Sequence, residues 1–260
     1  MPAIIPIPAF TDNYIWLLRE GRHAVVVDPG DAAPVAAYLD REGLVLAAIL
    51  NTHHHADHVG GNAALLARAP VPVFGPAHEN IPGRTRALVE GDVITVPGIG
   101  IDLAVLDVPG HTAGHIVYTG TDGGDGTPIA FVGDTLFACG CGRVLEGTPA
   151  QMAASLAKLA ALPAATLAYC AHEYTLANIR FALAVEPGNA ALVARAGQAK
   201  ATRDAGRPTV PSTIADELAT NPFLRAAVPE VFAAAEARAG RRLASPVDAF
   251  AVLREWKNAF

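Results

Sequence analysis

Seven of the nine histidines in this sequence fall in three short segments, which makes them candidate metal ligands. The densest segment, residues 52–58, reads Thr-His-His-His-Ala-Asp-His and directly follows an apolar run. His53 and His55 point to the same side at the end of a strand, because side chains alternate along it. Asp57 and His58 then lie in the following turn. Two imidazoles at one position and a carboxylate–imidazole pair at the next predict two adjacent cation sites.

Three more candidate ligands, His111, Asp134 and His172, each close an apolar run elsewhere in the chain. A histidine that follows a strand by itself is a structural residue more often than a ligand. Because segment 52–58 already supplies several candidate ligands, we interpret these three residues as metal ligands too. Asp134 is the candidate bridge, because a carboxylate can offer one oxygen to each of two cations.

The elements that must carry these residues alternate between strands and helices. Six apolar, β-branched runs each end in Asp, Gly, Pro or His. This pattern is typical of strands that deliver a polar residue to a loop. The runs lie at 23–30, 46–53, 71–76, 92–111, 127–135 and 166–172. Helix-like segments at 61–69 and 148–162 separate some of them, the second with Thr148 as its N-cap. This alternation predicts an α/β layered domain over residues 1–172.

Residues 173–260 have a different pattern, rich in alanine and in helix-favouring residues. Proline and glycine break this part into short helical segments, and no Gly/Ser-rich linker separates it from the first part. We therefore predict a helical C-terminal domain over residues 173–260 that packs on the first domain. No strand is expected after Tyr174.

The composition excludes several classes of protein. The chain of 260 residues has a net charge of −6, 52% hydrophobic residues and three cysteines. It is too apolar to be disordered, has too few cysteines for a disulfide scaffold, and has no apolar run long enough to span a bilayer. The net negative charge argues against nucleic-acid binding. We predict a cytoplasmic monomer that binds neither nucleic acid nor membranes.

The charge is unevenly distributed along the chain. Residues 173–260 hold 11 basic and 9 acidic residues, whereas residues 1–172 hold 8 and 16. Bound cations could offset the acidic part, and the mildly basic part could attract a small anion. On charge alone, an ordinary charged helical surface is the better explanation of the basic part.

The order and spacing of these segments resemble the metallo-β-lactamase superfamily. The resemblance is carried by THHHADH (52–58), PGHTAGH (109–115), VGDTLF (132–137) and the later His172. It implies an αββα sandwich with a metal site at one edge. It also implies that His53, His55 and His111 hold one metal, that Asp57, His58 and His172 hold the other, and that Asp134 bridges them.

Four segments also resemble the hydroxyacylglutathione hydrolase (glyoxalase II) family. They are FACGCGRVLEGT (137–148), AHEYTLANIRFALAVEPGN (171–189), NPFLR (221–225) and LREWKN (253–258). The resemblance implies hydrolysis of S-D-lactoylglutathione and related S-(2-hydroxyacyl)glutathiones to glutathione and a 2-hydroxy acid, a step of methylglyoxal detoxification. It also implies two divalent metal ions, with zinc as the first choice and iron or manganese as alternatives.

Such a substrate is a flexible anion, so the resemblance implies basic and aromatic contacts beside the metals. The expected substrate contacts are Arg143, Val144, Leu145, His172, Tyr174, Arg254 and Lys257. Arg254 and Lys257, three residues apart on a helix, face the same way and can hold a carboxylate. Many family members have an aromatic residue, often tyrosine, at the position of Leu145, so this chain lacks a hydroxyl contact there.

The chemistry that this ligand set implies is attack on the thioester carbon by a hydroxide that two metal ions share. One metal then polarises the carbonyl group and stabilises the oxyanion. Asp134, as the bridge, and Asp57, as a proton carrier, are the candidate catalytic residues. Two alternatives stay open: a glutathione persulfide dioxygenase with a single iron, and a nuclease or binding module of the same fold.

The remaining conspicuous residues receive structural interpretations. Packing or surface positions are expected for His23, His78, Cys139, Cys141 and Cys170, and loop-shaping roles for residues 12–14 and 28–30. His54 is expected to point away from its ligand neighbours, as a supporting or a structural residue. His115 stays open between orienting the site and filling a hydrogen-bonded core position.

Overall fold

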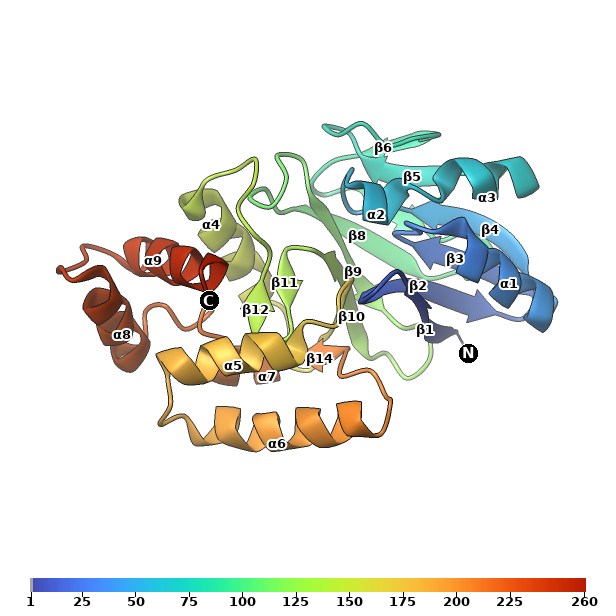
Figure 1. Ribbon diagram of the computed structural model, residues 1–260. Helices are drawn as coiled ribbons and strands as arrows, with labels where there is room; N and C mark the ends of the chain where they lie inside the picture. Colours follow the sequence, from blue (N-terminus) through green and yellow to red (C-terminus); the bar gives the residue numbers. More distant parts are fainter. Residues whose placement is uncertain (1) are drawn as a thin grey trace.

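Two six-stranded sheets pack face to face in the computed structural model, which describes residues 2–260 (Figure 1). The first sheet has the order β1 (Ala3–Ala9), β2 (Asn13–Glu20), β3 (His23–Val27), β4 (Val45–Leu50), β5 (Val73–Pro76) and β6 (Arg86–Leu88). The second has the order β14 (Ser212–Thr213), β13 (Leu167–Cys170), β10 (Pro128–Gly133), β9 (Ile116–Thr121), β8 (Asp102–Asp107) and β7 (Val93–Thr95). A short hairpin of β11 (Leu136–Phe137) and β12 (Gly140–Cys141) follows β10.

Both faces of the first sheet are buried, and successive side chains of a strand enter different cores. In β2, Trp16 and Leu18 belong to the core between the sheets, whereas Ile15 and Leu17 belong to the core under the outer helices. Phe131 of the second sheet is fully buried in the core between the sheets. Burial on both faces explains why the strands are continuous apolar runs rather than alternating ones.

Helices cover the outer faces of both sheets. α1 (Ala32–Glu42), α2 (Ala56–Val59) and α3 (Asn62–Arg68) lie against the first sheet, and α4 (Pro149–Ala160) lies on the side of the second (Figure 1). α4 begins at its predicted N-cap: Thr148 Oγ1 accepts from the backbone N–H of Gln151, and the Gln151 side chain accepts from that of Thr148. The αββα sandwich confirms the predicted fold class.

The C-terminal region is mainly helical, as predicted. α5 (Thr175–Val185), α6 (Ala190–Asp204), α7 (Ile214–Thr220), α8 (Pro229–Ala239) and α9 (Pro246–Asn258) lie on the side of the molecule away from α1 and α3 (Figure 1). Phe250 and Leu253 of α9 share an apolar core with Met152 and Leu156 of α4, so this region packs directly on the sandwich. Along residues 2–260, no helix combines the length and apolar character that crossing a membrane requires.

The sequence patterns did not reveal three strand regions: the hairpin of β1 and β2, the hairpin of β11 and β12, and β14. β1 contains Pro6 and Pro8 but is the edge strand of its sheet, where proline is tolerated because one side makes no ladder hydrogen bonds. β14 pairs antiparallel with the first half of β13, so the expectation of no strand in the C-terminal region was wrong. Two paired residues such as Ser212 and Thr213 have no periodicity from which a strand could be predicted.

Candidate metal centre

The seven side chains predicted to bind metal come together in one place. They reach it from the loops after β4, β8, β10 and β13 and from the short helix α2, so strand ends deliver them as predicted. Within this place two groups form, in each of which the ligand atoms lie within 4.8 Å of one another. The first group is His53, His55 and His111, and the second group is Asp57, His58 and His172.

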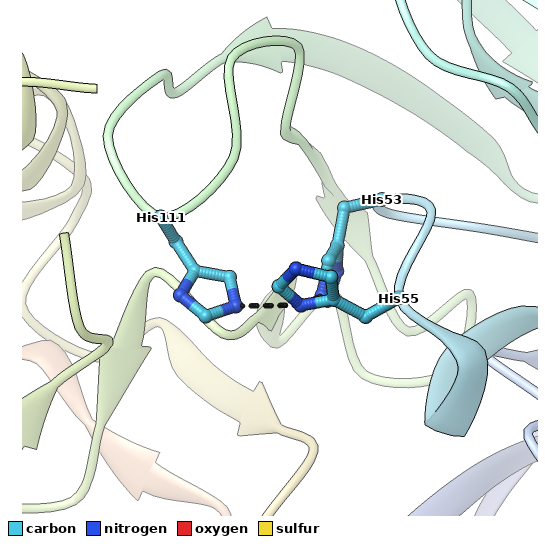
Figure 2. Close-up of side chains that lie close together, drawn as sticks. All are labelled: His53, His55 and His111. Atoms are coloured by element: carbon cyan, nitrogen blue, oxygen red, sulfur yellow. Dashed lines mark hydrogen bonds between the residues drawn. The ribbon is translucent and has the colours of Figure 1, made fainter. Parts of the chain in front are cut away.

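The first group arranges three imidazole nitrogens around a common point. His55 Nδ1 lies 3.1 Å from His53 Nε2 and 3.0 Å from His111 Nε2. Figure 2 shows a nitrogen of the His55 ring directed toward a nitrogen of the His111 ring. Burial lowers the pKa of His53 far below its usual value and also lowers the pKa of His55. Both rings are therefore neutral at pH 7 and have a lone pair available for a cation.

Hydrogen bonds behind the rings fix which nitrogen faces inward. The Thr52 hydroxyl donates its only proton to Asp28 Oδ2 at 2.7 Å, so its oxygen accepts from His53 Nδ1 at 3.1 Å. The backbone carbonyl of Arg143 accepts from His111 Nδ1 at 2.9 Å. Each arrangement leaves the Nε2 lone pair directed into the first group, as a metal ligand requires.

Asp134 lies between the two groups and presents one carboxylate oxygen to each. Its Oδ2 is 3.4 Å from His111 Nε2 in the first group. Its Oδ1 is 3.4 Å from His58 Nε2 and 3.5 Å from His172 Nε2 in the second group. Asp57 Oδ2 lies 3.4 Å from His172 Nε2. A carboxylate so placed can bridge two cations.

The histidines of the second group are surrounded by carboxylates, of which Asp134 and Asp28 are buried. Burial alone would raise the pKa of Asp134, but His58 and His172 hold it well below its usual range. Burial alone would lower the pKa of His172, but Asp134 and Asp57 raise it to about 10. Burial is likewise overcome at His58, whose pKa Asp134 and Asp28 raise well above its usual value. The positive charge of the protonated histidines offsets the negative charge of these carboxylates, as bound cations would.

Three buried atoms of the predicted ligands have no hydrogen-bond partner within residues 2–260. They are His58 Nδ1, His58 Nε2 and Asp134 Oδ1, of which the last two face each other at 3.4 Å. An unpaired buried polar atom costs about 1–3 kcal/mol, and a cation coordinated by the two facing atoms would remove that cost for them. Imidazole nitrogens and carboxylate oxygens without a thiolate suit zinc, iron or manganese. The residues present therefore fit a divalent metal.

Two residues that were predicted only to shape loops hold the second group in place. Asp12 Oδ1 accepts a hydrogen bond from His172 Nδ1 at 2.7 Å. Asp28 Oδ2 lies 3.1 Å from His58 Nδ1, and Asp28 is buried. Asp28 directly follows β3, and this strand-end position was a usable signal. Asp12 lies in the turn between β1 and β2, for which the sequence offered none.

A β-bulge at the end of β10 aims Asp134 at the two groups. The pairing with β13 shifts register before Gly133, which has a φ of 48°. A Cβ at Gly133 would lie 2.4 Å from Thr52 Oγ1, so only glycine fits. His115 Nε2 accepts from the backbone N–H of Asp134 at 3.1 Å, and its ring stacks on His53 at 4.6 Å. These contacts favour the orienting role for His115.

A cavity of about 320 Å³ opens beside the centre and contains four of the expected substrate contacts. Its lining includes His111 and Asp134 together with Arg143, Tyr174, Arg254 and Lys257. The Tyr174 ring stacks on the ring of His172, with the centroids 4.7 Å apart. The other three expected contacts lie outside this lining: Val144 packs against the core, Leu145 is 57% exposed, and the His172 ring is stacked on Tyr174.

Three basic residues, Arg143, Arg254 and Lys257, line the cavity. Arg254 is only 7% exposed, and its guanidinium donates to the backbone carbonyl of Cys141 at 2.8 Å. Burial lowers the pKa of Lys257, and Arg254, Arg180 and Arg143 lower it further. In the described part of the chain, neither Arg143 nor Arg254 nor Lys257 forms an ion pair. A buried guanidinium beside two further cations, none of them paired with a carboxylate of residues 2–260, indicates a site for an anion.

The remaining histidines and cysteines lie largely as expected. His23 and His78 are exposed, and Cys139, Cys141 and Cys170 are buried and free. Burial raises the pKa of Cys139 to about 11 and that of Cys170 to about 12, so these thiols stay protonated and fill space. His54 turns toward the carboxylates of Glu79 and Glu146.

Two family models together match nearly the whole chain. Residues 9–172 match the metallo-beta-lactamase superfamily, and residues 173–260 match the hydroxyacylglutathione hydrolase C-terminus. The hydroxyacylglutathione hydrolase of Cupriavidus taiwanensis is 57% identical over 267 residues, which cover 100% of both chains. That of Alkalilimnicola ehrlichii is 60% identical over 260 residues, which cover 99% of both chains.

Solved structures share the fold. ETHE1 from Myxococcus xanthus has a TM-score of 0.65 at 24% identity, covering 100% of this chain and 99% of that one. This likeness concerns the fold alone. TTHA1623, crystallised in a di-iron-bound form, has a TM-score of 0.53 at 29% identity, covering 65% of this chain and 91% of that one.

Proposed function

Since the chain belongs to the hydroxyacylglutathione hydrolase family, we propose that it hydrolyses S-D-lactoylglutathione and related S-(2-hydroxyacyl)glutathiones to glutathione and a 2-hydroxy acid. The observation that carries this proposal is a cavity with unpaired cations that borders directly on Asp134. Purified, zinc-loaded protein is expected to release free thiol from S-D-lactoylglutathione at a rate proportional to enzyme concentration. Absence of hydrolysis with a fully loaded centre would contradict the proposal.

The centre is proposed to hold two divalent ions, zinc in the first place and iron or manganese as alternatives. The first ion would be held by His53, His55 and His111, the second by Asp57, His58 and His172, with Asp134 between them. Two separate groups and a carboxylate facing both support two ions rather than one. TTHA1623, in its di-iron-bound form, supports iron as an alternative. Elemental analysis is expected to give about two ions per chain.

When bound, the metal pair supplies a water of lowered pKa, about 7 instead of 15.7 on zinc, and a Lewis acid for the thioester carbonyl. Asp134 would hold the two ligand groups at a fixed separation. Asp57 Oδ2 accepts from Asn13 Nδ2 at 3.1 Å, and the Asp57 side chain is 41% exposed, so it can pass a proton to solvent. No serine or cysteine nucleophile is needed.

The glutathione half of the substrate is proposed to lie in the cavity. Its two carboxylates match the unpaired cations there, and the stacked ring of Tyr174 offers a flat wall beside the second group. Residues 1–172 would thus supply the metal centre, while residues 173–260 supply Tyr174, Arg254 and Lys257 for binding. The whole substrate would be a small molecule held between the two parts of the chain.

No observation favours the alternative of a persulfide dioxygenase with a single iron. That reaction would use fewer ligands, whereas both groups are complete here, including Asp57, His58 and His172. Oxygen consumption with glutathione persulfide would be the result that revives it. A nuclease is disfavoured by the net charge of −6.

Substrate binding is expected to weaken at alkaline pH, because the Lys257 ammonium loses its proton at a lower pH than an ordinary lysine does. Burial and the neighbouring arginines place the pKa of Lys257 below its usual value of 10.5. The ammonium group binds an anion only while protonated, so KM should rise as the pH climbs through this lowered pKa. Lys257→Arg, whose guanidinium stays protonated, is expected to keep a low KM to higher pH. KM measured from about pH 7 to about pH 10, with the spontaneous hydrolysis subtracted, tests this. The same rise of KM with pH in both proteins would contradict this expectation.

Metal affinity is expected to depend on Asp12, which accepts from His172 Nδ1. Asp12→Ala should weaken binding at the second group by about 10- to 100-fold, because the His172 ring loses the acceptor that orients it. Asp12→Asn retains an acceptor oxygen and should lose less. Competition with a chelator measures the affinity. Asp40→Ala, which breaks a surface ion pair with Arg68, is the control, and equal affinities for the two alanine variants would refute the role of Asp12.

A further inference from the structure

We propose that Glu146 is a positioning residue for substrate binding, because it fixes the loop that carries Arg143 against the metal-binding loop. The loop spans residues 142–147 and joins β12 to α4. We call Glu146, His54 and Glu79 the Glu146 clamp. This inference rests on the proposed function, since it assigns Arg143 to the glutathione half of the substrate.

Glu146 joins two segments through its two carboxylate oxygens. Oε1 lies 3.2 Å from His54 Nε2, beside the first metal group. Oε2 accepts a hydrogen bond from the backbone N–H of Ala113 at 2.9 Å. The Glu146 side chain is 37% exposed, so its role is not to fill the core. An exposed carboxylate with two such partners ties segments together without being needed for packing.

His54 also contacts a second, buried carboxylate, that of Glu79. Its Nδ1 lies 3.0 Å from Glu79 Oε2, and the Glu79 side chain is only 2% exposed. Glu79 Oε1 accepts from the backbone N–H of Gly114 at 3.0 Å and from the Thr112 hydroxyl. The His54 ring therefore lies between two carboxylates that each accept a backbone N–H from the loop following His111. This gives His54 a structural use that its position between two ligands did not reveal.

Backbone hydrogen bonds join the same two loops. The N–H of Glu146 donates to the carbonyl of His111 at 3.3 Å, and the N–H of Gly147 donates to that of Gly110 at 3.2 Å. In return, His111 Nδ1 donates to the carbonyl of Arg143 at 2.9 Å. None of these bonds involves the Glu146 carboxylate, so they can hold the His111 ring without it, whereas the carboxylate adds the tie to Ala113 and His54.

The Arg143 side chain depends on the position of its backbone, because no partner among the described residues holds the guanidinium itself. Within residues 2–260 its side chain makes no hydrogen bond or ion pair, although it lines the cavity. A long side chain on an irregular loop loses conformational freedom when it binds a ligand. Fixing the backbone beforehand lowers the entropy still to be lost, which favours binding.

The test is a double-mutant cycle on KM for S-D-lactoylglutathione. Glu146→Ala is expected to raise KM about tenfold while kcat changes less than about threefold and metal content stays the same. Glu146→Gln keeps an acceptor for the Ala113 N–H and should raise KM less. If Glu146 acts through Arg143, adding Glu146→Ala to Arg143→Ala should raise KM by less than about twofold. Multiplicative effects, or an unchanged KM in Glu146→Ala, would overturn the proposal.

Glu236→Ala is the matched control. Glu236 also accepts one backbone N–H, from Leu243 at 2.9 Å, and pairs with one cation, Arg242, but it lies on α8 outside the cavity lining. It is expected to leave KM unchanged. Any general weakening of the fold by loss of a glutamate would appear in both variants.

Hydrogen exchange separates failure of the clamp from failure of the proposed function. The amide of Ala113 and those of residues 142–147 are expected to exchange faster in metal-loaded Glu146→Ala than in the unsubstituted chain. Unchanged exchange would overturn the clamp even if the enzyme hydrolyses its substrate. Faster exchange in a chain that hydrolyses no thioester would support the clamp as a structural device and refute the proposed reaction instead.

Discussion

Replacing Asp134 by alanine is expected to remove bound metal and thioesterase activity together. Asp134 is only 7% exposed, and its two oxygens face the two histidine-containing groups. Asp57, the other carboxylate among the seven predicted ligands, lies beside His58 and His172 of the second group and does not take this bridging position. Loss of several kcal/mol of charge stabilisation corresponds to at least about a thousandfold lower kcat/KM.

Metal content per chain and thioester hydrolysis measure this effect in one preparation. Asp134→Asn keeps the shape of the side chain and removes its charge, so it is expected to show the same loss and to exclude a packing defect as the cause. Asp125→Ala, on the exposed loop between β9 and β10, is the control that should keep both metal and activity. A variant of Asp134 that retained two ions and full turnover would refute the bridging role.

Replacing Arg254 by alanine is expected to raise KM by about 10- to 100-fold without loss of metal. The guanidinium is buried in the cavity wall, lies over the Phe223 ring at 5.0 Å and has no carboxylate partner. A charge held there is available to a substrate carboxylate, and a charge-assisted hydrogen bond is worth about 1.5–3 kcal/mol. The chemical step takes place at the metal centre, so kcat should change little.

A second substrate distinguishes a binding defect from a structural one. A small thioester that lacks the carboxylates of glutathione is expected to be hydrolysed equally by Arg254→Ala and by the unsubstituted chain. Arg238→Ala is the matched control, because Arg238 also lies over an aromatic ring in the helical region, that of Trp256 at 5.7 Å, outside the cavity. Equal losses with both substrates would contradict a contact between Arg254 and glutathione.

The candidate ligands could be predicted because their signals are local. His53, His55, Asp57 and His58 lie within six residues, and period-two alternation alone shows which of them share a side. His111, Asp134 and His172 follow apolar strands, so the same strand-end argument brings them to the same edge. The structure places all seven together, within the reach that two cations require.

The supporting residues could not be predicted, because their partners are distant in the chain. Asp12 lies 160 residues from His172, and Glu146 lies 33 residues from Ala113. The hairpin that carries Asp12 was missed as well, since its prolines resemble a loop until its place at the sheet edge is known. Such residues depend on tertiary pairing, which no local period encodes.

In the loop 142–147, the sequence did not predict correctly which side chains face the cavity. A basic residue and its two successors were expected to touch substrate together, but only Arg143 lines the cavity. Val144 turns to the core and Leu145 to solvent, because contacts of Glu146 and Gly147 with the neighbouring loop set the course of the backbone. In an irregular segment the direction of each side chain depends on these distant contacts.

The hydrogen bond between Asp12 and His172 also bears on the order in which the ligand groups form during synthesis of the chain. The segment 52–58 is translated long before His172, so a nascent chain first offers a passing ion an incomplete coordination sphere. The N-terminal hairpin must wait for β13 before its carboxylate has a partner. If the second group holds an ion as proposed, tight binding there would require the N-terminal hairpin and β13 to have come together, because only then does Asp12 orient His172.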